Sequence, residues 1–304
     1  MMKKKPTESS FSPSSLPTTL RIGHSPDPDD AFMWYPLADL DGKGPKVDTS
    51  PYRFQHILED IESLNRRAEK AELEITAISI HQYAYVAKNY ALTSCGSSMG
   101  DGYGPMVVSP RRGQLIGPAD IEQLHIAVPG ERTTAFLALS LLLGHKPKHY
   151  TVVPFDQIIE RTRSGEFDAG LIIHEGQLTY GEAGLHCVID LGKWWTDSRK
   201  LPLPLGGNAI RRDLAGDFGH ICRILQSSIE YALKHRDQAV GYALNYARDM
   251  GRDLADRFVG MYVNDWTLDY GAKGRAAVQR LLTEAAAAGI TPAVGEIDFV
   301  SPGT

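Results

Sequence analysis

Cysteine is scarce in this chain of 304 residues, which contains Cys95, Cys187 and Cys222 and no Cys-x-x-Cys pair. An odd number of widely spaced cysteines supplies neither a disulfide framework nor the paired ligands of a zinc knuckle. The cysteine content therefore favours a reducing, cytoplasmic setting.

The chain also lacks a basic excess and a long apolar run. Lys and Arg number 32 against 37 Asp and Glu, so the net charge of -5 excludes the electrostatic footprint of a nucleic-acid-binding protein. No segment approaches the roughly 20 apolar residues of a membrane span. Residues 3–5 are lysines, as at the start of a signal peptide, but residues 6–19 contain no apolar core. We therefore expect no nucleic-acid partner, no membrane association, no secretory signal and a disordered tail over residues 1–19.

Strand-like and helix-like segments alternate after the tail. Residues 20–24, 52–54 and 75–80 have the length and apolar character of strands, and apolar steps of three and four between 57 and 71 predict an amphipathic helix. Prolines 26 and 28 exclude a helix from the first loop, so we expect Asp29 or Asp30 to cap a helix that begins near Ala31. This alternation is typical of a parallel sheet covered by helices.

A similar passage occurs later, with a helix expected near residues 155–162 and a strand over 169–173. The strand of the first passage ends at Ser79 and that of the second at His174. Ligands of open α/β sheets bind at this end of the strands. The length suggests two lobes, and crossing candidates near 107–113 and 201–207 predict a discontinuous lobe I (20–108 plus 205–304) with lobe II (109–204) inserted.

His174 is the first candidate for chemistry. A zinc hydrolase would need a second histidine at position 178, which is Leu178, so metal hydrolysis is not indicated. Two interpretations of His174 remain: a structural histidine at a strand end, or a general base that titrates near neutral pH. The carboxylates of Asp27, Asp29 and Asp30 are interpreted as turn and cap groups, because they stand beside prolines without the spacing of metal ligands.

Thr133 and Thr134 are candidates for ligand binding. They stand between an apolar strand and the apolar helix expected over 135–143, after a turn at Gly130. Hydroxyls and free backbone N–H groups at a helix start bind anions, although an ordinary threonine cap is the alternative. Asn65 lies on the apolar side of its helix, where a buried amide needs a partner.

Six segments together resemble, in order, the 1,4-dihydroxy-6-naphthoate synthase family of the futalosine route to menaquinone: 24–32, 60–65, 96–105, 128–135, 171–175 and 201–206. The resemblance spans about residues 20 to 270. It implies an α/β, two-lobed fold like that of class-II periplasmic binding proteins, in which each lobe is a mixed, mainly parallel sheet flanked by helices. It also implies a lyase that converts cyclic dehypoxanthinylfutalosine to 1,4-dihydroxy-6-naphthoate with no cofactor and no metal.

The resemblance also implies roles for single residues. His174 matches the family's proposed base, and Asn65, Ser79, Thr133 and Thr134 match positions that bind substrate in the cleft. The chain departs from the family by its tail, by an insertion around 41–45, and by the glycine at position 176.

Two rival functions stay open. One is a non-enzymatic solute-binding protein of the same fold, which would need a secretory signal, and the other is the sibling chorismate dehydratase. The expected partner is a small-molecule substrate, and the sequence carries no signal for an oligomeric state.

Overall fold

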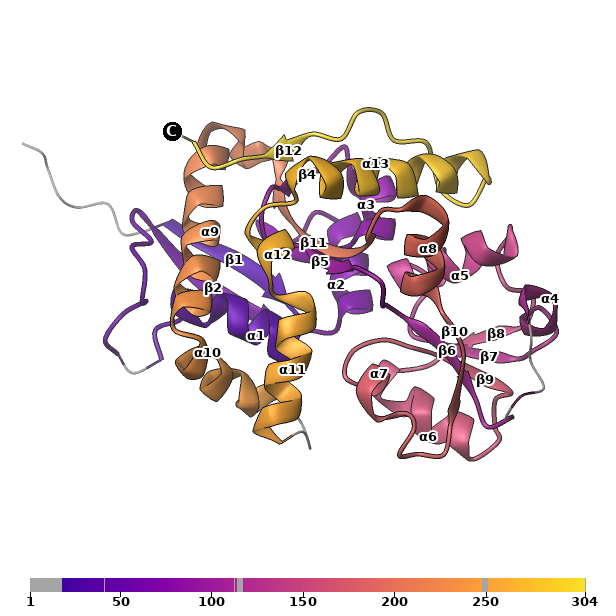
Figure 1. The fold of residues 1–304 in the computed structure, drawn as a ribbon. Helices are drawn as coiled ribbons and strands as arrows, with labels where there is room; N and C mark the ends of the chain where they lie inside the picture. The colour runs from indigo at the N-terminus through magenta and orange to yellow at the C-terminus, as the bar shows by residue number, and fades with distance from the viewer. Residues whose placement is uncertain (1–17, 41, 112, 114–116, 248–250, 304) are drawn as a thin grey trace, which may run out of the picture.

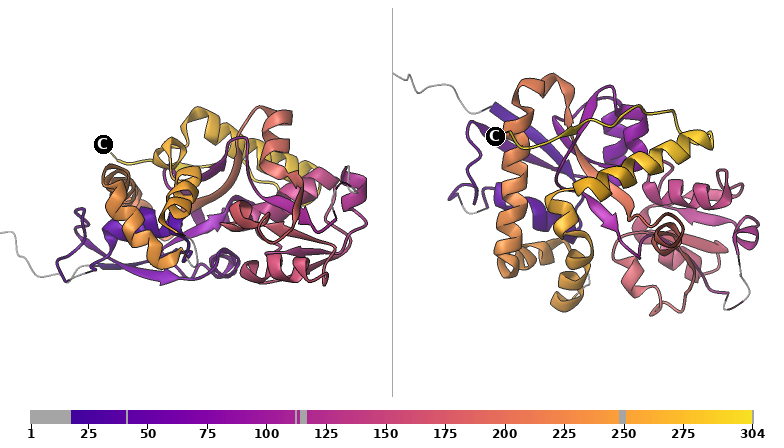
Figure 2. Two further views of the ribbon diagram at one scale, coloured as in Figure 1. Left: turned by 60° about the horizontal axis from the view of Figure 1, so that its bottom comes forward. Right: turned by 45° about the horizontal axis from the view of Figure 1, so that its top comes forward.

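The computed structural model describes residues 18–40, 42–111, 113, 117–247 and 251–303, and within them two α/β lobes lie side by side (Figures 1 and 2). Most of the expected disordered tail lies outside the described residues. Its last two residues, Thr18 and Thr19, belong to the first strand instead, where they pair with Tyr52 and Arg53. No helix among the described residues is long and apolar enough to cross a membrane.

The first lobe is built on a mixed sheet of seven strands: β1 (Thr18–His24), β2 (Tyr52–Leu58), β3 (Ile75–Ser79), β4 (Tyr90–Thr93), β5 (Ser98–Gly100), β11 (Leu203–Arg211) and β12 (Phe299–Val300). Their order is β12-β4-β11-β3-β1-β2, and β5 pairs with β11. The strands expected at 20–24, 52–54 and 75–80 are therefore present as β1, β2 and β3.

The second lobe is built on a mixed sheet of five strands: β6 (Met106–Ser109), β7 (Ile126–Val128), β8 (Tyr150–Val152), β9 (Ala169–Ile172) and β10 (His186–Asp190). Their order is β10-β6-β9-β7-β8. β7 runs parallel to β8 and β9, whereas β6 runs antiparallel to both of its neighbours.

The chain crosses from the first lobe to the second and back, and the strand that follows each crossing is the one that pairs antiparallel with its neighbours. β6 enters the second lobe and β11 returns to the first, and every antiparallel pairing involves one of these two strands. The predicted boundaries at 108/109 and 204/205 cut through β6 and β11. Strand pairing places the crossings earlier in the chain, at residues 101–105 and 200–202. The sequence could not show this, because an apolar run such as 107–108 can join either sheet and its pairing partners are distant in the chain.

Helices cover both sheets (Figure 1). Those of the first lobe are α1 (Pro28–Trp34), η1 (Tyr35–Leu37), α2 (Ile61–Glu69), α3 (Ile80–Val86), η3 (Arg212–Asp217), α9 (Phe218–Lys234), α10 (Arg236–Ala243), η4 (Leu244–Tyr246), α11 (Arg252–Tyr262), α12 (Asp265–Leu268) and α13 (Gly271–Ala287). Those of the second are α4 (Pro118–Ile121), α5 (Thr134–Leu143), η2 (Phe155–Gln157), α6 (Ile158–Arg163), α7 (Gly176–Thr179) and α8 (Leu191–Arg199).

The start of α1 corrects the sequence analysis. The helix begins at Pro28, with Asp27 at the N-cap position, and not near Ala31. Proline is tolerated at the first helical position because the N–H that it lacks would have no intrahelical partner there. Asp29 and Asp30 consequently lie inside the first turn, and neither is the cap.

One hydrophobic core continues from lobe to lobe. Ile78 and Tyr83 of the first lobe and Val128 and Phe136 of the second belong to the same buried cluster. Helix α5 packs against α3 and α13 of the first lobe as well as against α8. The carboxyl ends of β3 and β9 are thereby brought toward one another.

Candidate active site

A cavity of about 130 Å³ lies between the two lobes and is lined by residues of both. Four of the five predicted site residues line it, namely Ser79, Thr133, Thr134 and His174. Asn65, the fifth, is fully buried and is not among the lining residues. The structure therefore brings together residues that are separated by about 95 positions in the sequence.

Asn65 lies outside the cavity, where its side chain is hydrogen-bonded to Ser79 and holds that residue in place. Its Nδ2 donates to Ser79 Oγ at 3.0 Å, and its Oδ1 accepts from the Ser79 N–H at 2.9 Å. Helix α2, which carries Asn65, has Asp60 as its N-cap, whose carboxylate accepts from the N–H groups of Glu62 and Ser63. The hydrogen-bonding partner that the buried Asn65 carboxamide requires is thus Ser79, the last residue of β3.

Thr133 is the N-cap of α5. Its hydroxyl accepts from the Phe136 N–H at 3.2 Å and donates to the Gly130 carbonyl at 2.8 Å. Both hydrogen-bonding functions of that hydroxyl serve the protein, which agrees with the cap alternative.

The Thr134 hydroxyl joins the two lobes. It donates to the Leu205 carbonyl on β11 at 2.6 Å and accepts from the His81 N–H at 3.2 Å. The N–H groups of Thr134 and Ala135 occupy the first two positions of α5, where no intrahelical acceptor exists, and both residues line the cavity. The donors available to an anion are therefore these backbone N–H groups, and the two side chains hold them in place.

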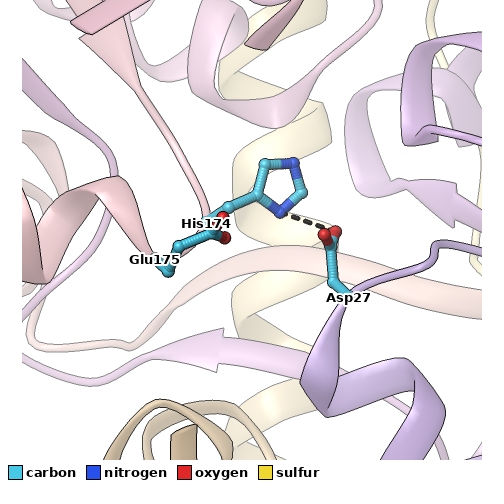
Figure 3. A group of neighbouring side chains, drawn as sticks. All are labelled: Asp27, His174 and Glu175. Carbon is cyan, nitrogen blue, oxygen red and sulfur yellow. Dashed lines mark ion pairs between the residues drawn. The ribbon is translucent and has the colours of Figure 1, made fainter. Parts of the chain in front are cut away.

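His174 follows β9 in an unusual backbone conformation. Its φ is 59°, in the left-handed region that residues with a Cβ seldom adopt and that often marks a functional site. The imidazole packs on the Phe155 ring with centroids 4.4 Å apart, and Nδ1 lies 2.8 Å from Oδ2 of Asp27 (Figure 3). The other ring nitrogen, Nε2, is buried and has no hydrogen-bond partner among the described residues.

The charges around His174 set its protonation. Burial alone would lower the pKa of the imidazole, but the charge and hydrogen bond of Asp27, with the charges of Glu175 and Asp29, outweigh burial and raise that pKa to about 9. Burial, together with the neighbouring carboxylates Asp30 and Asp27, raises the pKa of Asp29 well above its ordinary value. Burial likewise raises the pKa of Asp30 to about 6.

Asp27, His174 and Glu175 form a compact group of possible metal ligands. One donor atom of each lies within 4.8 Å of the others, and Figure 3 shows the two carboxylates on the Nδ1 side of the ring. An imidazole with two carboxylates is a donor set that zinc or manganese accepts. The interpretation of Asp27 as a turn carboxylate is therefore incomplete, because its side chain reaches His174 in the other lobe.

Sequence reasoning also missed a second pair across the cavity. The Tyr262 hydroxyl of α11 donates to Oε1 of Gln177 on α7 at 2.8 Å, and both side chains are buried in the cavity wall. No spacing rule connects such distant positions. Gly176 lies next to this wall but is not among the cavity-lining residues, and a Cβ there would meet Ile159.

Comparison with known proteins decides the family. Residues 20–287 match a family described as menaquinone biosynthesis. A 1,4-dihydroxy-6-naphthoate synthase of Thermus thermophilus is 40% identical over 89% of this chain and 95% of its own length. The chain belongs to this family. A second member, from Streptomyces coelicolor, is 35% identical over 91% of this chain and 96% of its own length.

Solved structures extend the comparison to the fold. A protein from Archaeoglobus fulgidus is 45% identical, with a TM-score of 0.80 over 90% of this chain and 98% of that one. The alkanesulfonate-binding protein of Xanthomonas axonopodis pv. citri is 12% identical, with a TM-score of 0.67 over 93% and 98% of the two chains. The second likeness shows only the fold. The naphthoate synthase family member described here is thus a menaquinone-biosynthesis enzyme on a periplasmic-binding-protein-like scaffold, which confirms the predicted fold class.

Proposed function

We propose that this enzyme converts cyclic dehypoxanthinylfutalosine to 1,4-dihydroxy-6-naphthoate in the cavity between the lobes, with His174 as the general base. The observation that carries the proposal is Nε2 of His174, which is buried and lacks a partner among the described residues. His174 shares the cavity with the free N–H groups at the start of α5. A base and hydrogen-bond donors that can bind an anion therefore line the same cavity.

The proposed reaction can proceed with a base and hydrogen-bond donors for an oxyanion. Loss of a proton from carbon, followed by retro-aldol-type cleavage of a carbon–carbon bond, opens the spiro-cyclic sugar and releases a small sugar-derived fragment. Aromatisation of the remaining ring system to the naphthoate drives the reaction. Neutral His174 accepts the proton at Nε2 and becomes an imidazolium beside Asp27. The N–H groups of Thr134 and Ala135, with the Ser79 hydroxyl, hold the carboxylate or the developing oxyanion of the substrate.

The rivals make different demands. A solute-binding protein would bind its ligand without turnover and work outside the cytoplasm, whereas we propose a cytoplasmic enzyme. A chorismate dehydratase would act on a smaller substrate with two carboxylates. The relatives at 35–40% identity are named as naphthoate synthases, which favours the naphthoate synthase activity over the solute-binding protein and the chorismate dehydratase.

The test is a product assay on both candidate substrates with the wild type and His174→Asn. We expect naphthol absorbance to appear from cyclic dehypoxanthinylfutalosine and chorismate to remain unconsumed. Asparagine cannot accept a proton near neutral pH, so turnover of the variant falls by roughly 10²–10⁴-fold while KM changes little.

The control is His186→Asn, the same substitution on β10, since His186 is not among the cavity-lining residues. Its turnover should match the wild type. Near-normal turnover of His174→Asn would exclude His174 as the base, and ligand binding without turnover would establish the solute-binding rival.

A further inference from the structure

We propose that Asp27 is a positioning residue for His174, supplied by the opposite lobe, so that the catalytic base is complete only when the two lobes are together. This inference rests on the role of His174 proposed above.

The carboxylate of Asp27 contacts the histidine and does not cap its own helix. Asp27 stands at the N-cap of α1, but its side chain makes no capping hydrogen bond there. Oδ2 lies 2.8 Å from Nδ1 of His174, and the Asp27 side chain is only 2% exposed. A buried carboxylate is costly unless it is paired, so the ion pair with His174 accounts for its presence.

The contact fixes which nitrogen of the imidazole can act as the base. A carboxylate accepts hydrogen bonds, so Nδ1 carries the proton, and in the neutral ring the lone pair is then on Nε2. Nε2 is the buried nitrogen without a partner among the described residues, on a side chain that lines the cavity. Asp27 thus leaves the free lone pair of His174 on the nitrogen that lacks a protein partner.

Other charged groups near the ring do not replace Asp27. A carboxylate oxygen of Glu175 also lies within 4.8 Å of the donor atoms of Asp27 and His174, but the contact of 2.8 Å with Nδ1 is made by Asp27. Burial raises the pKa of Asp29 well above its ordinary value, and Asp30 accepts from the Ser25 N–H. The imidazole also packs on the apolar ring of Phe155, whose centroid is 4.4 Å from its own.

The two partners come from different lobes. Asp27 follows β1 of the seven-stranded sheet, and His174 follows β9 of the five-stranded sheet. Tyr262 and Gln177 make a second contact between the lobes in the same cavity wall. Separation of the lobes would remove the carboxylate from the imidazole, so closure over the substrate and assembly of the base are one event.

The variants that test this role are Asp27→Asn and Asp27→Glu, with Asp190→Asn as the matched control. Asn at position 27 removes the charge and can donate to Nδ1, which would leave the proton on Nε2. Asp190 caps α8 by accepting from the Lys193 N–H at 2.9 Å, and Asn also caps helices, so the control removes the charge of a carboxylate that is not among the cavity-lining residues.

The first measurement is the NMR titration of the His174 imidazole in the substrate-free protein, assigned by comparison with His174→Asn. In the wild type we expect a pKa well above that of an ordinary histidine. In Asp27→Asn it should fall by more than one unit, in Asp27→Glu it should stay high, and in the control it should not move.

The second measurement is the pH profile of kcat/KM. The base acts when it is deprotonated, so the wild-type rate rises with pH through the high pKa of His174. In Asp27→Asn the rise should shift to lower pH and kcat should fall by about 10²-fold or more, with KM changed by less than about threefold. Asp27→Glu should recover part of kcat.

Two results would overturn the proposal. An unchanged His174 titration in a folded Asp27→Asn protein would reduce Asp27 to a structural residue. Stoichiometric binding of added zinc or manganese, with loss of wild-type activity on chelation, would make Asp27 a metal ligand. Because the titration needs no substrate, a wild type without turnover would refute the proposed function while the Asp27 result still stands.

Discussion

Asn65 and Ser79 show how single residues set the geometry of the cavity. The Asn65 carboxamide makes two hydrogen bonds with Ser79: its Nδ2 donates to the hydroxyl, and its Oδ1 accepts from the backbone N–H. A buried amide with two such bonds has little freedom, so the Ser79 hydroxyl is held in one orientation at the end of β3. Asn65 supports the wall in this way without touching the cavity.

The two threonines should respond differently to the loss of their hydroxyls. Thr133→Val removes the cap of α5 and should lower the stability by roughly 0.5–2 kcal/mol, with little change in KM once the protein is folded. Thr134→Val breaks the bonds to Leu205 and His81, so the first turn of α5 loses its anchor to the first lobe and KM should rise. Thermal unfolding and steady-state kinetics measure the two effects.

Thr133→Ser is the control, because serine caps a helix as well as threonine does. A raised KM with normal stability in Thr133→Val would show instead that its hydroxyl contacts the substrate directly.

At the scale of elements, the glycine-rich segment 94–105 serves two purposes. Gly96, Ser98 and Pro105 line the cavity, while residues 101–105 form the first crossing between the sheets. The crossing lies directly against the start of α8, where a Cβ on Gly192 would collide with the Tyr103 carbonyl. Close backbone contact at this point explains why glycine is required on the helix.

Substitution of that helical glycine tests the contact. Gly192→Ala should destabilise the protein by about 1–3 kcal/mol, because backbone atoms must move to admit the methyl group. Gly241→Ala on α10 is the matched control, since a Cβ there meets nothing within 4 Å and alanine favours the helix by up to about 1 kcal/mol. Chemical denaturation of both variants gives the comparison, and equal stabilities would contradict the predicted collision.

At the scale of the whole molecule, the crossings between the lobes differ from the candidates at 107–113 and 201–207. Those candidates would place the bends near Ser109 and near residues 204–206. Ser109 is the last residue of β6 and pairs with His186, and residues 204–206 lie inside β11. Strand pairing restrains both places, so bending is expected at 101–105 and 200–202.

Closure of the lobes can be measured in solution. We expect small-angle scattering to give a smaller radius of gyration for the protein saturated with product than for the free protein, because ligand contacts with both lobes favour the closed form. Asp27→Asn, which lacks one charge of the pair between the lobes, should be more open without ligand. Identical curves for free and saturated wild type would refute closure.

Much of the fold could be predicted from local patterns. The apolar face of α9 is the stripe that its sequence shows, and β1, β3 and β9 coincide with short apolar runs. Such patterns are local, because the periods of helix and strand decide which side chains share a face. The same patterns did not assign β6 and β11 to their sheets, since pairing depends on segments far away in the chain.

The candidate site also contains features that follow from local sequence and features that depend on distant segments. The places of Ser79, Thr133 and His174 at strand ends and at a helix start can be predicted from the chain alone, because turn and cap chemistry is set by near neighbours. The contacts of Asp27 with His174 and of Tyr262 with Gln177 depend instead on how the two lobes pack. These contacts join opposite lobes, and the packing of two sheets on a shared core brings their partners within hydrogen-bond distance.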